Sequence, residues 1–127
     1  MSRARALSTP TAEDVLTGLS VTRFKSLARS LGLDNETLGR QLGIAPATLY
    51  RRMAAGKFTS QEGDRLARLL RLYARALEIL GNPESVREWF MNPNPSLGGS
   101  KPFELVKTDP GSVEVERLLS RIEYGVF

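Results

Sequence analysis

The 127-residue sequence contains no cysteine and no histidine. The absence of cysteine excludes disulfide bonds and thiolate metal sites, and the absence of histidine removes the commonest general base and the commonest metal ligand. No apolar run is long enough to span a bilayer, and no signal-peptide pattern is present. The sequence therefore predicts a cytoplasmic protein that is not an enzyme and has no catalytic residues, metal, cofactor, small-molecule substrate or membrane partner.

The residues that are present make an ordinary globular composition, 41% hydrophobic and 25% charged. The net charge of +4 is unevenly distributed. Residues 1–80 carry 13 Lys/Arg against 7 Asp/Glu, whereas residues 81–127 carry 5 Lys/Arg against 7 Asp/Glu. A basic first part favours a polyanionic partner, and the mildly acidic second part does not share that preference. Two parts with two partners is the simplest interpretation.

Helical periodicity and helix-boundary residues recur along the chain, and no strand pattern is present. The sequence predicts an all-α fold with helices at about 11–18, 22–31, 35–42, 46–55, 59–80 and 82–90, a short helical turn at 102–107, and a last helix around 115–122. Pro110-Gly111 is expected to be a break. The predicted regions are a flexible basic tail (1–10), a bundle ending in a long central helix (11–80) and a small helical C-terminal domain (81–127).

The stretch from Asn35 to Met53 has the spacing of a helix-turn-helix motif. Gly39 is the small residue where the two helices cross, and Gly43 supplies a left-handed turn. The apolar positions that complete the pattern are Leu38, Leu42, Ile44 and Leu49. Arg52 occupies the usual place of the second core anchor, so Met53 is expected to take that role, and Ala45 is a weak N-cap.

The second helix of this motif carries the candidate DNA contacts. In a major groove, Arg51 can reach guanine O6 and N7, while Ala47 and Thr48 can touch thymine methyl groups. Phosphate contacts are expected from Arg52, Arg40 and Lys57. The alternative is an ordinary helical hairpin with a solvated pair of arginines.

Several further features have plainer interpretations. The arginines at 65, 68, 71 and 75 are read as the solvated face of the long helix rather than a second nucleic-acid surface. Trp89 is expected in the core. Residues 98–101 read Gly-Gly-Ser-Lys, but they lack the first Walker glycine and follow no strand, so a tight turn is expected. The aromatic end, residues 122–127, either packs into its own core or serves as a docking peptide.

The C-terminal part resembles the C-terminal domain of Xre/MbcA/ParS-type antitoxins. The pattern is a Trp, then PN-x-x-LGG, a P-x-x-L turn, T-x-x-G, and a final helix ending in YG; here it is carried by Trp89, Pro93-Asn94, Leu97-Gly98-Gly99, Pro102, Leu105, Thr108, Gly111 and Tyr124-Gly125. The region upstream is similar to the Xre-like part of the same proteins, and the resemblance covers about residues 12–127.

The resemblance implies a function beyond what the spacing indicates. Members of this family pair with a co-encoded RES-domain toxin that consumes NAD or uses it for ADP-ribosylation, and they block its active site. Many also dimerise and repress their own operon, so a homodimer on operator DNA is expected. The implied toxin contacts are Asn94, Leu97, Gly98, Gly99, Lys101, Arg121, Tyr124, Val126 and Phe127.

Two other functions are also compatible with the sequence. One is a stand-alone helix-turn-helix transcription regulator whose C-terminal domain only dimerises. The other is an enzyme that uses carboxylates such as Glu84, Glu88 and Glu104, which the lack of histidine and cysteine disfavours. The first alternative predicts operator binding without a toxin, and the second predicts turnover that one carboxylate substitution abolishes.

Overall fold

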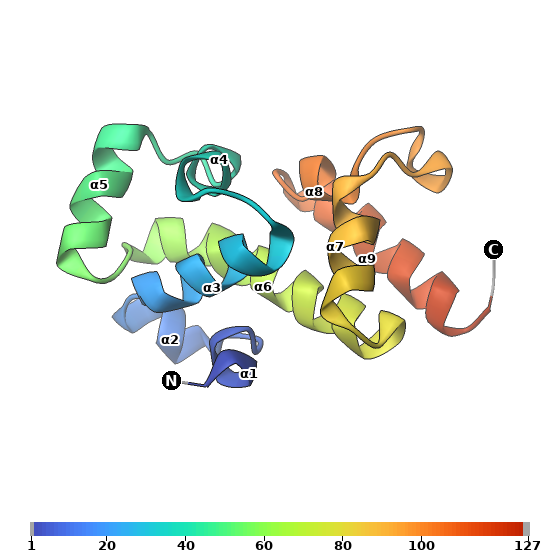
Figure 1. Cartoon of the computed structure of the whole chain (residues 1–127), viewed down its shortest axis with the longest axis horizontal. Helices are drawn as coiled ribbons and strands as arrows, with labels where there is room; N and C mark the ends of the chain where they lie inside the picture. Colours follow the sequence, from blue (N-terminus) through green and yellow to red (C-terminus); the bar gives the residue numbers. More distant parts are fainter. Residues whose placement is uncertain (1, 126–127) are drawn as a thin grey trace. The chain divides into compact units, whose positions relative to one another are not determined.

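A computed structural model describes residues 2–125, apart from the side chain of Arg3. The described chain is helical, without a named strand (Figure 1). Its elements are α1 (Arg3–Ala6), α2 (Ala12–Thr17), α3 (Val21–Leu31), α4 (Asn35–Gln41), α5 (Pro46–Ala55), α6 (Ser60–Leu80), α7 (Pro83–Met91), the 3₁₀ helix η1 (Pro95–Leu97), α8 (Pro102–Leu105) and α9 (Asp109–Glu123). None of the described helices is long and apolar enough to cross a membrane. The all-α prediction is confirmed.

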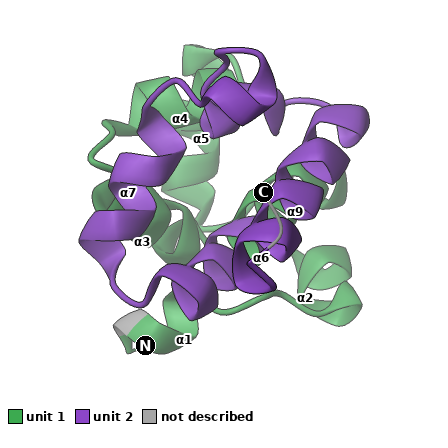
Figure 2. Ribbon diagram, turned by 90° about the vertical axis from the view of Figure 1, so that its right-hand side faces the viewer, with its two compact units in different colours: residues 1–71 green, residues 72–127 purple. Residues whose placement is uncertain are grey.

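The chain divides into two compact units, residues 1–71 and 72–127 (Figure 2). In the first unit α3 packs against α1 and α4, and α4 packs against α5. In the second unit α8 packs against α7 and α9, and η1 packs against α9. The long helix α6 contributes its first part to one unit and its last part to the other.

The core of the first unit is made by apolar side chains of α3 to α6 and of the segments that connect them. The rings of Phe24 and Phe58 lie 5.2 Å apart. Around them the buried side chains include Leu19, Val21, Leu27, Leu31, Leu38, Leu42, Ile44, Leu49, Leu66, Leu69 and Leu70. Each such side chain contributes about 1.5–3 kcal/mol when it leaves water, so this apolar set dominates the stability of the unit.

Residues 3–7 differ from the loose tail that the sequence predicts. Arg3–Ala6 form a short helix, and Ala6 and Leu7 are buried. The buried guanidinium of Arg23 in α3 holds this segment: its Nε donates to the carbonyl of Ala6 at 3.2 Å, and its Nη2 donates to the carbonyl of Ser8. A contact between residues this far apart leaves no periodic signal in the sequence.

The predicted break at Pro110-Gly111 is wrong, because both residues lie in the first turn of α9. Thr108 caps this helix, with its Oγ1 accepting a hydrogen bond from the Gly111 amide at 3.1 Å. Proline is tolerated in the first turn, where its missing N–H has no helical partner. A Cβ at position 111 would lie 1.8 Å from the Leu105 carbonyl oxygen, so only glycine fits beside that backbone.

Trp89 is not in the core as predicted. It is half-buried, while the neighbouring Phe90 is fully buried. The two rings meet edge to face, with centroids 5.2 Å apart. Successive residues of a helix point in different directions, so the apolar face of α7 takes Val86 and Phe90 inward and leaves Trp89 at its edge.

Candidate functional site

The two helices of the motif approach closely at Gly39. A Cβ there would lie 2.9 Å from Cδ2 of Leu49, which is buried. The Ile44 amide donates to the Gly39 carbonyl at 2.8 Å and closes the connection. The roles predicted for Gly39 and Leu49 are therefore confirmed: the first makes room for α5, and the second fills that room.

The turn between α4 and α5 is held from α6. Gly43 has φ +73°, the left-handed conformation predicted for it. Nη1 of Arg65 donates to the Leu42 carbonyl at 2.5 Å, next to that turn. Arg65 is half-buried, so its interpretation as part of a solvated face is wrong. The last carbonyls of a helix have no hydrogen-bond partner within that helix, and Arg65 supplies a donor to one of them.

Arg52 also joins α5 to α6. Its Nε lies 2.7 Å from Oε1 of Glu62, and its Nη2 lies 3.0 Å from Oε2. This hydrogen bonding holds the pKa of the Glu62 carboxyl below its ordinary value. The side chains of Arg52 and Glu62 are 25% and 12% exposed. The sequence did not predict this bidentate pair, because its partners lie on different helices.

The outward side of α5 carries the three predicted base contacts. Ala47 and Arg51 are exposed, and Thr48 is half-buried. Nη2 of Arg51 donates to Oγ1 of Thr48 at 3.1 Å, so the two side chains lie together on this side. Tyr50, on the same helix, is 78% exposed and adds an aromatic group to the surface of α5.

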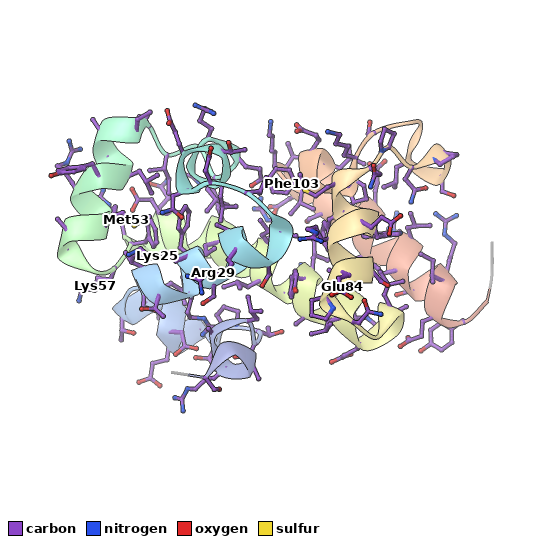
Figure 3. The ribbon with its side chains drawn as sticks, in the orientation of Figure 1. Lys25, Arg29, Met53, Lys57, Glu84 and Phe103 are labelled. Carbon is purple, nitrogen blue, oxygen red and sulfur yellow. The ribbon has the colours of Figure 1, made fainter. Side chains whose placement is uncertain are left out.

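The two predicted phosphate contacts outside α5 are both exposed. Lys57 follows the end of α5 and extends outward there (Figure 3). An isolated bridge between Ser20 and Lys57 fixes the backbone at this point. Arg40 on α4 forms an i,i+4 ion pair with Glu36 at 3.1 Å. Such an exposed pair contributes little and leaves the arginine available to another anion.

Met53 takes the predicted anchor position only in part. It is half-buried, whereas Leu49 is 6% exposed. Ala45 makes no side-chain capping bond, as its weak capping propensity predicts. The seating of α5 therefore depends on Leu49, Arg52 and the turn more than on a second apolar anchor.

In the second unit, the η1 turn and one side of α9 line a groove of about 990 Å³. Its lining residues are Ser96, Leu97, Gly98, Val113, Glu114, Glu116, Arg117, Ser120 and Arg121. The groove brings together Leu97, Gly98 and Arg121 from the expected toxin contacts, but not Asn94, Gly99, Lys101 or Tyr124. The sequence missed Val113 and Arg117, although their i,i+4 spacing before Arg121 could have indicated a shared face.

The tight turn expected at residues 98–101 is present at Gly98 and Gly99, at the end of a loop that closes between residues 94 and 100. The Asn94 amide donates to the Ser100 carbonyl at 3.0 Å, and Oδ1 of Asn94 accepts from the Ser96 amide at 2.9 Å. Gly98 and Gly99 have φ of +67° and +86°. Asn94 is thus occupied in shaping the turn, while Gly98, Gly99 and the adjacent Lys101 are exposed.

The end of α9 is tied to α6 by another bidentate ion pair. The guanidinium of Arg75 contacts both carboxylate oxygens of Glu123, at 2.9 and 2.7 Å, and this holds the pKa of Glu123 below its ordinary value. The solvated interpretation of Arg75 is therefore wrong. Tyr124, the next residue, is 75% exposed and not packed into the core. Val126 and Phe127 lie outside the described residues.

Comparisons with known proteins agree with this division. Residues 10–71 match the model of the antitoxin Xre-like helix-turn-helix domain. Residues 75–125 match the model of the antitoxin Xre/MbcA/ParS C-terminal toxin-binding domain. A toxin is therefore the partner class of the C-terminal domain, and the helix-turn-helix suggests DNA as the other.

Curated relatives carry the same assignment over most of the chain. Antitoxin Xre of Yersinia enterocolitica is 31% identical over 117 residues, which cover 91% of this chain and 79% of the relative. Antitoxin Xre of Photorhabdus laumondii is 30% identical and covers 86% of this chain and 75% of the relative. A protein named Prs ADP-ribosylating antitoxin, from a Sphingobium species, is 24% identical and covers 87% and 76%. The chain belongs to the Xre/MbcA/ParS-type antitoxins of toxin–antitoxin systems, and it carries their helix-turn-helix and toxin-binding domains.

Proposed function

We propose that this chain neutralises a RES-domain toxin that acts on NAD, by blocking the toxin's active site, and that it represses its own operon. The observation that carries the proposal is the match of the two antitoxin domain models, in order, to residues 10–71 and 75–125. The Sphingobium relative is named for ADP-ribosylation, and that reaction draws its ADP-ribose from NAD. An inhibitor of this kind acts by occupying the toxin and needs no catalytic residue, so the chain is not an enzyme.

The toxin-binding surface is assigned to the exposed parts of the second unit. Its proposed residues are Asn94, Leu97, Gly98, Gly99, Lys101, Arg121, Tyr124, Val126 and Phe127. Support comes from the exposure of Gly98, Gly99 and Lys101, from the groove that Leu97, Gly98 and Arg121 share, and from the 75% exposed ring of Tyr124. Asn94 contributes to toxin binding indirectly, because its hydrogen bonds to Ser96 and Ser100 shape the turn.

The operator-binding surface is assigned to α5 and the residues beside it. Arg51 contacts guanine, and Ala47 and Thr48 contact thymine methyl groups. Lys57 and Arg40 contact phosphates and supply affinity without sequence information. Arg52 positions α5 through Glu62 instead of serving mainly as a phosphate ligand, because two of its nitrogens are already engaged.

Residues 11–80 bind DNA and form the homodimer, residues 81–127 bind the toxin, and residues 1–10 contact neither DNA nor toxin. The protein acts in the cytoplasm, where its operator and toxin are. A helix-turn-helix dimer binds two half-sites about one helical turn apart, so the operator is expected to be a partial palindrome.

The experiment that tests toxin inhibition measures growth and cellular NAD after induction of the neighbouring toxin gene, with and without this chain. Induction alone should deplete NAD and stop growth, and co-expression should restore both. A harmless neighbour, or no rescue by this chain, would reject the RES-toxin proposal and favour a stand-alone transcription regulator.

Autorepression is tested by binding the purified protein to its own promoter DNA. Arg51→Ala should weaken operator binding by about 1–3 kcal/mol and relax base specificity at one position. Arg29→Ala is a matched control, since Arg29 is exposed on α3 and outside the assigned surface (Figure 3). Unchanged operator affinity in Arg51→Ala would reject the assignment of Arg51 to the major groove.

A further inference from the structure

We infer that the α9 groove receives a toxin segment that presents a carboxylate next to an apolar side chain. The groove is the one lined by the η1 turn and α9, and its proposed contacts are Leu97, Val113, Arg117 and Arg121. The inference rests on the proposed function, because it names the chemistry of the toxin element that the C-terminal domain binds.

The apolar part of this surface comes from Val113 and Leu97. Val113 is 43% exposed, although the following positions Val115, Leu118 and Leu119 of the same helix are buried. Leu97, at the end of η1, is half-buried and lines the same groove. Single exposed valines are common, but one that shares a groove with a second apolar side chain offers an apolar contact to a partner.

The cationic part comes from Arg117 and Arg121, one helical turn apart. Both are exposed, and within residues 2–125 neither guanidinium has an ion pair or hydrogen-bond partner. Two other cations of this unit are paired: Lys107 with Glu104 at 2.9 Å, and Arg75 with Glu123. Arg87 and Lys101 are as open as Arg117 and Arg121 among the described residues, but they do not line the groove. Glu123 pairs with Arg75 through both oxygens, and among the described residues it forms no ion pair with Arg121.

The groove is also lined by two carboxylates, Glu114 and Glu116. Glu116 is engaged in another interaction. With two acidic and two basic residues the lining has no net charge, so long-range attraction of an acidic partner is weak. Selection of a carboxylate must then come from short hydrogen bonds to a guanidinium, whose planar fork matches the two oxygens of a carboxylate.

This arrangement predicts how binding responds to mutation. Loss of a short charge-assisted contact acts mainly on the dissociation rate, whereas loss of long-range steering acts on the association rate and its salt dependence. A substitution at Arg117 should therefore accelerate dissociation of the toxin and leave the association rate nearly unchanged.

The experiment measures binding kinetics between the purified product of the neighbouring toxin gene and full-length variants of this chain. The variants are Arg117→Glu, Arg117→Lys and Val113→Asp. The matched control is Arg87→Glu, because Arg87 is exposed on α7 of the same unit and does not line the groove. Circular dichroism and thermal unfolding of each variant verify that it is folded.

Arg117→Glu and Val113→Asp should each raise Kd about tenfold or more through faster dissociation, and Arg117→Lys should recover part of the loss. Arg87→Glu should stay within about twofold, as expected outside an interface core. Equal effects of Arg117→Glu and Arg87→Glu, or tight binding by all folded variants, would overturn the groove assignment while toxin binding itself stands. No binding by the wild-type chain would instead overturn the proposed function and this inference with it.

Discussion

The guanidinium of Arg52 in α5 binds the carboxylate of Glu62 in α6 through two hydrogen bonds, 2.7 and 3.0 Å long. Glu62 also helps to cap the N-terminus of α6. Its Oε1 accepts a hydrogen bond from the Thr59 amide at 3.0 Å, and Thr59 Oγ1 accepts one from the Glu62 amide. A single carboxylate thus completes a capping box and fixes the proposed DNA-contacting helix to the helix that follows.

The salt dependence of operator binding should separate Arg52 from a phosphate contact. Each phosphate contact adds about 0.9 to the slope of log K against log salt concentration. Lys57→Ala should lower that slope by about one such increment. Arg52→Ala should weaken operator binding through a less firmly held α5 while the slope stays unchanged. A slope lowered equally by Arg52→Ala would show that Arg52 contacts a phosphate directly.

The Arg52–Glu62 pair should make stability depend on pH. The hydrogen bond from Arg52 lowers the pKa of Glu62 in the folded chain. The resulting stabilisation is present above the carboxyl's unfolded pKa of about 4.3 and is lost as pH falls through the lower, folded value. Glu62→Gln should therefore lower the free energy of unfolding at pH 6 and have a smaller effect near pH 3.

Urea unfolding between pH 3 and pH 7 measures this difference. In an Arg52→Ala background, Glu62→Gln should lose most of its pH-dependent effect, because the main cause of the lowered pKa is gone. An undiminished effect would mean that the capping bonds from Thr59 carry the shift instead.

Gly111→Ala should be strongly destabilising. The added Cβ would lie 1.8 Å from the Leu105 carbonyl oxygen, and a backbone atom cannot move aside cheaply. We expect a loss of about 3 kcal/mol or more in the free energy of unfolding. Gly63→Ala is the control within a helix: its Cβ would meet Leu19 at 3.7 Å, and alanine there should stabilise by about 0.5–1 kcal/mol. Similar results for both variants would contradict the packing at Gly111.

Tyr73→Phe should not destabilise the protein. Tyr73 is fully buried, and its hydroxyl has no hydrogen-bond partner among the described residues. An unsatisfied buried polar group costs about 1–3 kcal/mol, so its removal should raise the free energy of unfolding by about 1 kcal/mol. Tyr50→Phe, at a 78% exposed position, should change stability by less than about 0.5 kcal/mol. A clear loss in Tyr73→Phe would reveal a buried water or other partner.

Removal of residues 124–127 should impair toxin neutralisation and leave operator binding measurable. Tyr124 is exposed beyond the end of α9, so its loss costs little packing. Co-expression with the toxin gene reports neutralisation, and promoter binding by the same truncated protein reports the integrity of the first unit. Full protection by the truncated chain would show that docking does not need the terminus.

Local sequence signals were sufficient for most of the helices and for the helix-turn-helix motif. The helix-turn-helix spacing depends only on contacts within one motif, those of Gly39, Gly43 and Leu49. Helix ends depend on neighbouring backbone groups: Thr11 and Asp34 cap the starts of helices, and Gly56 ends one. Pro110-Gly111 is an exception. The pair has the local pattern of a break, but it forms the first turn of α9, where glycine is needed beside the Leu105 carbonyl.

The sequence by itself determined the all-α class, the order of the helices and the resemblance to an antitoxin, because each follows from periodicity, capping and short motifs. Only the tertiary structure decided what the arginines do. Arg23 holds the N-terminal helix, Arg65 satisfies the end of α4, and Arg75 holds the end of α9. Their partners lie 17, 23 and 48 residues away, so no local pattern distinguishes them from solvated arginines such as Arg117 and Arg121.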